Sequence, residues 1–154
     1  MLRPAGAGDA AAVAAVLQAS RAQAMPWLPV VHDVDDVLAW VTTVLLPTRR
    51  VVVAEQQGAV VGACALDGSE LEQLYVAPHA QGAGLGRALL DDAEDASAGR
   101  LRLWTSTRNA RARRSYAAAG FREVFETDGA DDEDREPDVR LEWGAGHVTG
   151  TLLG

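Results

Sequence analysis

The chain has no lysine, so all 14 of its basic residues are arginines, and 22 acidic residues outnumber them. A formal net charge of −8 argues against nucleic acid as the main partner, because phosphate backbones are bound by basic surfaces. No apolar run approaches the roughly 20 residues that cross a membrane, and the first residues lack the basic and then hydrophobic layout of a secretory signal. We therefore expect a cytoplasmic protein that binds neither nucleic acid nor membranes.

Cysteine is almost absent as well. Cys64 is the only one, so no disulfide can form within the chain, and no Cys/His set has the spacing of a zinc site. Because Cys64 lies in an apolar, strand-like stretch, we expect it to be buried, and we expect no bound metal. Asparagine occurs once, at Asn109, and tyrosine only at Tyr75 and Tyr116, so these three residues stand out.

Hydrophobic periodicity and turn residues predict one compact α/β domain over residues 1–144, with a flexible tail over 145–154. The predicted strands are 2–4, 50–55, 59–66, 70–76, 101–105, 121–127 and 139–143. The predicted helices are 9–23, with Asp9 as N-cap, 33–44, stopped by Leu-Leu-Pro, 84–96 and 108–119. This order of elements is typical of an α/β sandwich with a mixed sheet.

The stretch LYVAPHAQGAGLGRALL, residues 74–90, has glycine at every second position between a predicted strand and a predicted helix. Glycine permits positive φ and lets a ligand approach the backbone, and free amides at a helix start bind anions. The stretch therefore predicts a pyrophosphate site, with a plain strand-to-helix turn as the alternative. A P-loop is excluded because it needs a lysine, and the dinucleotide fingerprint is excluded because its third glycine is missing.

The same stretch resembles the acyl-CoA motif of the GCN5-related N-acetyltransferases (GNAT family), Q/R-x-x-G-x-G/A, with Gln81, Gly84 and Gly86 in place. Residues 109–121, NARARRSYAAAGF, resemble the family's second motif, N-x-x-A-x-x-x-Y-x-x-x-G-F. The chain is also similar to a bacterial subgroup of the family at MPWLPVVH, LEQLYV and TDGADDEDREPDVRLEW. That similarity assigns no acceptor.

The resemblance implies the GNAT fold, a mixed and mostly antiparallel seven-stranded sheet with four helices, splayed between strands 4 and 5. It implies an acetyl-CoA-dependent N-acetyltransferase that needs no metal. The acetyl group would pass to a primary amine of a small molecule by direct attack in a ternary complex. Two alternatives stay open: a protein N-terminal or lysine acetyltransferase, and a non-catalytic acyl-CoA-binding module.

The resemblance also implies where acetyl-CoA binds. In the family a main-chain amide of the fourth strand polarises the thioester carbonyl, and by position this amide belongs to Val76. Asn109 would bond the pantetheine amides or cap the following helix, two compatible roles. The residues implied in binding the co-substrate are Leu74, Val76, Gln81, Gly82, Ala83, Gly84, Leu85, Gly86, Arg87 and Asn109.

Tyr116 is the candidate general acid, because a phenol with a pKa of about 10 suits proton donation to a departing thiolate. A core aromatic on an amphipathic helix is the alternative. For the base, strict strand alternation places Glu70 and Glu72 on one face with Leu74 and Val76. We prefer Glu72 over Glu70, and a water chain without a dedicated base is the third choice.

In the family the acceptor lies between two segments, which correspond here to residues 25–33 and 128–138. The first contains Trp27 and His32, our candidate substrate-binding residues, with a core tryptophan and a solvated histidine as the alternatives. The second is rich in acidic residues, and it predicts either a solvated loop or an acidic rim that attracts a cationic amine. The last strand often meets a second subunit in this family, which makes a homodimer a further expectation.

Overall fold

A computed structural model describes residues 1–27, 33–129 and 136–144, so His32 and the tail predicted for 145–154 lie outside the described residues. The strands are β1 (Leu2–Pro4), β2 (Arg50–Gln56), β3 (Ala59–Asp67), β4 (Glu70–Val76), β5 (Arg100–Ser106), β6 (Arg122–Thr127) and β7 (Asp138–Gly144). The helical segments are η1 (Ala7–Asp9), α1 (Ala10–Ala24), α2 (Val34–Trp40), η2 (Val41–Leu45), α3 (Leu46–Thr48), η3 (Pro78–Ala80), α4 (Leu85–Ala96) and α5 (Ala110–Ala118). No helix within these ranges is long and apolar enough to span a bilayer.

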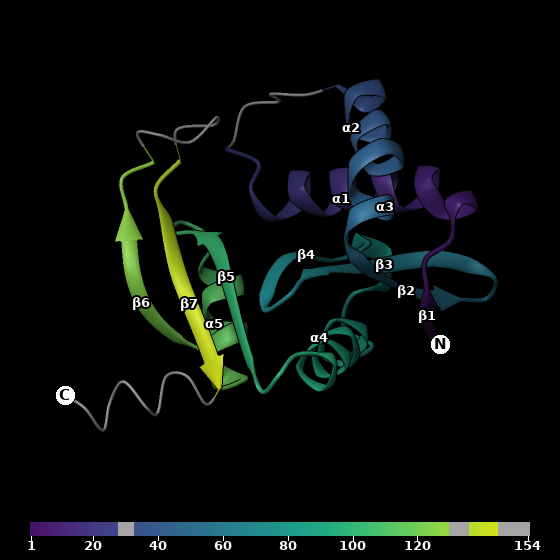
Figure 1. Ribbon diagram of the computed structural model, residues 1–154. Coiled ribbons are helices and arrows are strands. Elements are labelled where there is room, and N and C mark those ends of the chain that lie inside the picture. The colour runs from purple at the N-terminus through teal and green to yellow at the C-terminus, as the bar shows by residue number, and fades with distance from the viewer. Residues whose placement is uncertain (28–32, 130–135, 145–154) are drawn as a thin grey trace.

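The seven strands form one sheet in the order β1-β2-β3-β4-β5-β7-β6. Every neighbouring pair is antiparallel except β4 and β5, which are parallel. These two strands share a single register pair, Glu70 with Arg102, and diverge beyond it. Figure 1 shows the result, with β2–β4 running across the view and β5–β7 steeply inclined to them. The expected mixed, mostly antiparallel sheet with a splay between strands 4 and 5 is confirmed.

Alternate residues of β2 and β3 supply two hydrophobic cores on opposite faces of the sheet. Val51, Val53, Ala63 and Ala65 pack against α1 and η2. The residues between them, Val52, Ala54, Cys64 and Leu66, pack against Leu89, Leu90 and Ala93 of α4. Burial of each large aliphatic side chain stabilises the fold by about 1.5–3 kcal/mol, so both helix layers are held firmly to the sheet. Cys64 is buried, as expected.

The second predicted helix starts where expected and ends later than expected. Asp33 caps it, because its carboxylate accepts a hydrogen bond from the Asp36 N–H at 2.8 Å. The predicted stop at Val44 is wrong: a π-type turn, η2, continues into α3 and the helix ends at Thr48. The wider turn restarts the helix at Leu46, so Pro47 falls in a first turn, where its missing N–H removes no helical hydrogen bond.

Asp9 occupies the N-cap position predicted for α1, but its side chain makes no capping hydrogen bond to the helix. It is the last residue of η1, and its carboxylate points back to accept a hydrogen bond from the Gly6 N–H at 2.7 Å. Arg3 donates to both of its oxygens, at 2.8 and 2.9 Å, and also to Glu55 of β2. Asp9 therefore ties the start of α1 to β1 and β2 instead of capping the helix.

A β-bulge disturbs the alternation predicted along β4. Ala65 of β3 lies opposite Gln73, whereas its neighbour Leu66 lies opposite Leu71, so Glu72 is the extra residue. Leu71 consequently packs in the same core as Leu74 and Val76. The predicted sharing of one face by Glu70, Glu72, Leu74 and Val76 is therefore wrong, because Glu70 and Glu72 flank Leu71 and point to the other face.

Candidate functional site

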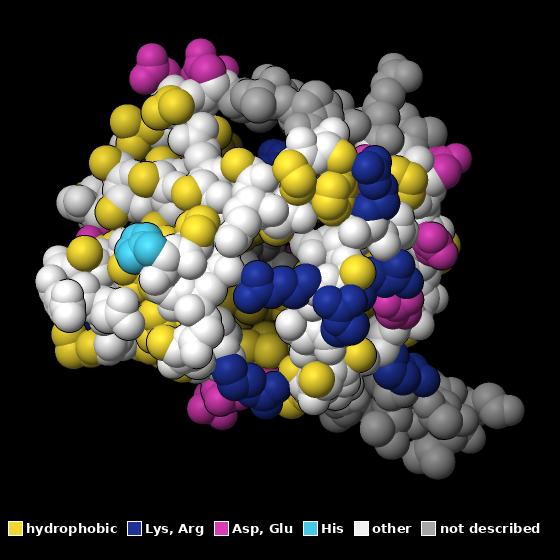
Figure 2. Space-filling view, turned by 180° about the vertical axis from the view of Figure 1, so that it is seen from behind, with side chains coloured by type: hydrophobic (Ala, Val, Ile, Leu, Met, Phe, Trp, Pro, Cys, Tyr) yellow, Lys and Arg dark blue, Asp and Glu magenta, His cyan; other side chains and the backbone are white. Residues whose placement is uncertain are grey.

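A cavity of about 670 Å³ opens where β4 and β5 diverge. Its walls come from the second half of α1, the end of β4, the glycine turn with the start of α4, and the face of α5 that carries Tyr116. Figure 2, which views the molecule from behind, shows a hollow near the middle of the surface, with arginine side chains beside it. The site is therefore a product of the splay, which leaves room between two strands that would otherwise be paired.

The end of β4 presents main-chain groups to this cavity. The Ala77 N–H donates to the Val61 carbonyl at 2.7 Å, so in an antiparallel pair the main-chain groups of Val76 point away from β3 and toward the gap. The Val76 carbonyl accepts hydrogen bonds from Ser20 Oγ at 2.7 Å and from Gln81 Nε2 at 3.0 Å. Its N–H faces the side from which β5 has withdrawn, an orientation that suits donation to a carbonyl oxygen in the cavity.

The glycine turn exposes the start of α4. Gly82 and Gly84 have φ values of 88° and 81°, in the left-handed region that glycine enters without strain. Gly84 is the N-cap, and the Ala88 N–H makes the first helical hydrogen bond to its carbonyl at 3.0 Å. The N–H groups of the first turn have no side-chain cap and no intrahelical acceptor. Free N–H groups at a helix start, together with the helix dipole, favour the approach of an anion.

Two arginines border the same cavity from opposite sides. Arg87 lies in the first turn of α4 and pairs with Asp91 at 2.9 Å. Arg111 lies in the first turn of α5 and donates to Gln81 Oε1 at 3.1 Å. Gln81 in turn donates to Gln23 of α1 at 2.8 Å, so its side chain links α1, β4 and α5 across the cavity. In a chain with net charge −8, this concentration of positive charge suits a phosphate-bearing ligand.

Tyr116 faces the cavity from α5. Asn109 starts the helix by accepting a hydrogen bond from the Ala112 N–H at 3.1 Å, which confirms its capping role, and Tyr116 follows two turns later. The Tyr116 ring packs edge-on against Phe121 with centroids 5.2 Å apart. Burial raises the pKa of the Tyr116 phenol well above its usual range, and nearby Tyr75 raises it further. The phenol therefore keeps its proton at neutral pH and can donate it.

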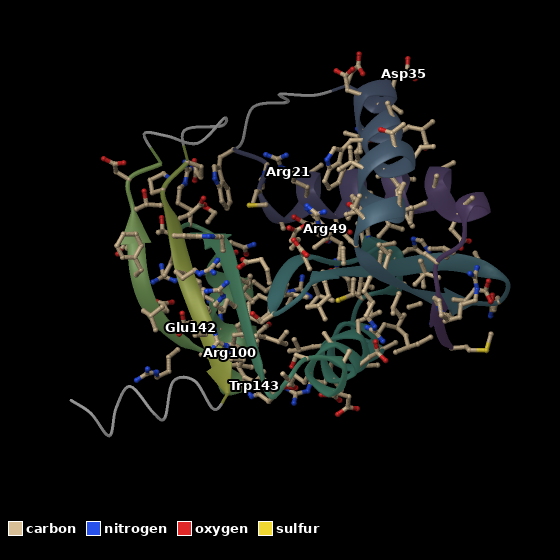
Figure 3. The ribbon with its side chains drawn as sticks, viewed as in Figure 1. Arg21, Asp35, Arg49, Arg100, Glu142 and Trp143 are labelled. Carbon is tan, nitrogen blue, oxygen red and sulfur yellow. The ribbon has the colours of Figure 1, made fainter. Side chains whose placement is uncertain are left out.

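Glu70 and Glu72 are held in ion pairs outside the cavity lining. Glu72 Oε1 lies 2.6 Å from Nε of Arg49, which is labelled in Figure 3. Glu70 makes two hydrogen bonds to Arg140, at 2.6 and 2.7 Å, and lies 3.7 Å from Arg102 Nε. Both carboxylates have arginine partners that the local sequence did not reveal, 23 and 70 positions away.

Trp27 joins the two segments that we expected to hold an acceptor. Its Nε1–H donates to Glu136 Oε1 at 2.8 Å, and the guanidinium of Arg108 lies 4.6 Å from its ring centroid. Ser106 also donates to Glu136, at 3.1 Å. Trp27 and Glu136 therefore connect one described residue from each of these segments, although Trp27 does not line the cavity in the described part of the chain.

Most residues expected to bind the co-substrate come together in the cavity wall. Those present are Leu74, Val76, Gln81, Gly82, Gly84, Leu85, Gly86, Arg87, Asn109 and, as the expected acid, Tyr116. Those outside the lining are Ala83, Glu70, Glu72 and Trp27. Sequence reasoning missed Tyr75, Ser20, Gln23 and Arg111. Tyr75 had one signal that could have drawn attention to it, since it is one of only two tyrosines.

Comparison with known proteins identifies the family. Residues 47–123, half of the chain, match the family model described as acetyltransferase (GNAT) domain. The chain therefore belongs to the GNAT family of acetyltransferases. A comparison with curated protein sequences gave no match.

Solved structures share the fold over nearly the whole chain. Apo-form YjaB from Escherichia coli is 21% identical with a TM-score of 0.77, and the match covers 94% of this chain and 98% of that one. A GCN5-related N-acetyltransferase from Rhodopseudomonas palustris is 24% identical with a TM-score of 0.75, covering 94% and 95%. PaiA N-acetyltransferase from Thermoplasma acidophilum, solved in complex with coenzyme A, is 17% identical with a TM-score of 0.71, covering 94% and 98%.

Proposed function

We propose that the protein transfers an acetyl group from acetyl-CoA to a primary amine of a small molecule, by direct attack in a ternary complex. The observation that carries this proposal is one cavity into which three features open: the outward-facing main chain of Val76, the uncapped start of α4, and Tyr116. Each suits a different part of an acyl-CoA thioester. The family assignment supports the acetyl-transfer part of the proposal.

The chain's own groups suffice to hold acetyl-CoA. The N–H groups of the glycine turn and the first turn of α4 would bind the pyrophosphate, with Arg87 and Arg111 adding positive charge. Leu74 and Val76 present a strand edge that β5 has left, and the pantetheine arm would occupy that edge beside Asn109. PaiA N-acetyltransferase, which shares the fold, was solved in complex with coenzyme A, in keeping with this co-substrate.

The reaction needs an electrophile, an acid and a way for one proton to leave. The Val76 N–H would polarise the thioester carbonyl, and a single such donor is worth roughly 10²–10³ in rate. The amine nitrogen attacks the carbonyl carbon and a C–N bond forms. The C–S bond then breaks, the thiolate takes the proton of the Tyr116 hydroxyl, and the proton lost by the amine restores the phenol.

The sequence allows three routes for the amine proton: Glu72, Glu70 or water. Arg49 holds Glu72 and Arg140 holds Glu70, so an attacking amine would have to compete with an arginine for either carboxylate. Neither carboxylate lines the cavity in the described part of the chain. These observations favour transfer of the proton through water.

A thiol-release assay with acetyl-CoA tests the proposal. The panel would contain spermidine, kanamycin, L-phenylalanine amide and a short peptide with a free N-terminus and a lysine. We expect turnover with at least one small amine, dependent on Tyr116. Turnover confined to the peptide would instead assign a protein acetyltransferase, and tight binding of acetyl-CoA without turnover of any amine would assign a binding module.

A further inference from the structure

Tyr75 and Tyr116 belong to different layers of the molecule. Tyr75 lies on β4 and packs with the α1 core, on the face that includes its register partner Ala63. Tyr116 packs with the α4 core and against Phe121, on the other face. Side chains on opposite faces of a continuous sheet are separated by the sheet itself. Both tyrosines nevertheless line the same cavity.

The divergence of β4 from β5 explains why the two tyrosines line one cavity. Because β4 leaves β5 after the Glu70–Arg102 pair, the cavity passes through the sheet and not only along one face. Burial raises the pKa of Tyr116 most, and Tyr75 raises it further, which accords with two phenols at one cavity. On the α1 side, Ser20 and Gln23 line the cavity with Tyr75. The α1 side is also where the chain continues to Trp27, in one of the two segments expected to hold the acceptor.

Neither phenol is satisfied by the protein. Within residues 1–27, 33–129 and 136–144, neither the Tyr75 hydroxyl nor the Tyr116 hydroxyl makes a hydrogen bond to another side chain or to the main chain. Both side chains are half-buried, and burial raises the pKa of Tyr75 as it does that of Tyr116, so both hydroxyls keep their protons at neutral pH. Each hydroxyl is therefore available to form a hydrogen bond with a ligand in the cavity.

We propose that Tyr75 is a substrate-binding residue of the reaction centre, placed on the acceptor side of the sheet opposite Tyr116. The inference rests on the proposed acetyl transfer and adds a residue that the family motifs do not single out. Its neutral hydroxyl accepts a hydrogen bond from an N–H of the attacking amine, which aims the nitrogen lone pair at the thioester. Tyr116, on the other face of the sheet, donates its proton to the departing thiolate sulfur of coenzyme A.

The presence of only two tyrosines makes a direct test feasible. Protein labelled with 13C at the tyrosine ring carbon that bears the hydroxyl gives two NMR signals, which Tyr75→Phe and Tyr116→Phe assign. We would titrate first coenzyme A and then acetyl-CoA. We expect the Tyr116 signal to move with both ligands, and the Tyr75 signal to differ between the two, because it faces the acyl end.

The outcomes separate this inference from the proposed function. A Tyr116 signal that moves while the Tyr75 signal stays fixed with both ligands overturns the role of Tyr75 and leaves the transferase proposal standing. Two fixed signals, with no heat of binding for acetyl-CoA, overturn both. The Tyr75→Phe spectrum before ligand addition also reports whether the remaining phenol keeps its native environment, and so whether the variant is folded.

Kinetics supply a second measurement, on whichever panel amine the protein turns over. Tyr75→Phe keeps the ring and removes one hydrogen bond, so we expect kcat/KM for the amine to fall about tenfold. The KM for acetyl-CoA should stay within about twofold, because the co-substrate lies on the Tyr116 side. A raised KM for acetyl-CoA with an unchanged kcat/KM for the amine would place Tyr75 against the co-substrate and contradict the proposal.

Discussion

Arg140 on β7 reaches across β5 to make two hydrogen bonds, at 2.6 and 2.7 Å, to Glu70 on β4. Glu70 is also the β4 residue of the single register pair that joins β4 to β5. The ion pair therefore links β4 to β7 across β5, at the point where β4 and β5 are still paired and just before they separate. This position gives Glu70 a structural role that is independent of any role as a base.

Glu70→Gln should lower stability. The substitution leaves Arg140, whose side chain is 13% exposed, without its anionic partner, and breaking such a partly buried pair typically costs about 1–3 kcal/mol. Thermal unfolding should detect a melting temperature several degrees lower than wild type. Glu126→Gln, on exposed β6, is the matched control and should change little. Lost activity at an unchanged melting temperature would instead identify Glu70 as the base.

Tyr116→Phe should lower kcat by about 10²–10³ while leaving the melting temperature nearly unchanged. The hydroxyl makes no hydrogen bond to the described residues, so its loss removes no protein contact. Burial raises the pKa of Tyr116 above its ordinary value of about 10, so the acid form persists as the pH rises. The wild-type rate should therefore rise with pH as the amine loses its proton, and it should not decline at any pH up to about 10.

A pH profile of kcat/KM for the amine between pH 6 and pH 9.5 tests whether the rate rises with pH as expected. A fall in wild-type activity between pH 7 and pH 9 that disappears in Tyr116→Phe would show a phenol that ionises early, against the effect of burial. Residual activity equal to wild type would remove Tyr116 as the general acid.

Gly84→Ala should weaken both folding and binding of coenzyme A. Gly84 has φ 81°, where a Cβ costs about 1–2 kcal/mol, and its main chain begins the turn proposed to hold the pyrophosphate. Gly99→Ala is a matched control at the other end of α4, because Gly99 has φ 85° and nothing lies within 4 Å of its would-be Cβ. Calorimetry should show weaker coenzyme A binding for Gly84→Ala only. Equal affinity in both variants would exclude this turn from the binding site.

The sequence predicted the sheet well because its strands are bounded by glycine turns and show clear hydrophobic patterns, so β4 was placed at Glu70–Val76 as observed. It did not reveal the β-bulge at Glu72, because a bulge depends on how β3 pairs with β4. Nor did it reveal Arg140 as the partner of Glu70, since that contact joins residues 70 positions apart.

Tyr75 illustrates a second limit. Alternation along β4 correctly separates Tyr75 from Leu74 and Val76. Local pattern therefore places Tyr75 away from the co-substrate, and only the opening between β4 and β5 brings it back to the same cavity as Tyr116. Motif spacing identified the residues on one face of the sheet, whereas the splay decides which residues of the other face can join them.

Arg111→Ala should raise the KM for acetyl-CoA several-fold with little change in kcat. Arg111 lines the cavity, and within the described chain its hydrogen-bonding partner is the neutral Gln81 amide, so its charge is available to a phosphate. Arg114→Ala, an exposed arginine of the same helix outside the lining, is the control. The difference between the two variants should shrink as salt rises, because exposed charges are screened. An equal effect of both substitutions would indicate general attraction and not a specific contact.

Asp9→Asn should remove part of the acid sensitivity of folding. Hydrogen bonds from Arg3 and from the Gly6 N–H lower the pKa of Asp9 from 3.8 to about 2. A carboxylate with a depressed folded-state pKa stabilises the fold above its unfolded pKa, and that contribution is lost as the pH falls from about 4 through 2. Urea unfolding at pH 7 and at pH 2.5 should therefore show Asp9→Asn less stable than wild type at the higher pH, with a clearly smaller difference at the lower. Asp95→Asn, on the exposed face of α4, should show no such convergence. A constant difference for Asp9→Asn at both pH values would mean that the contacts of Asp9 act through geometry and not through its charge.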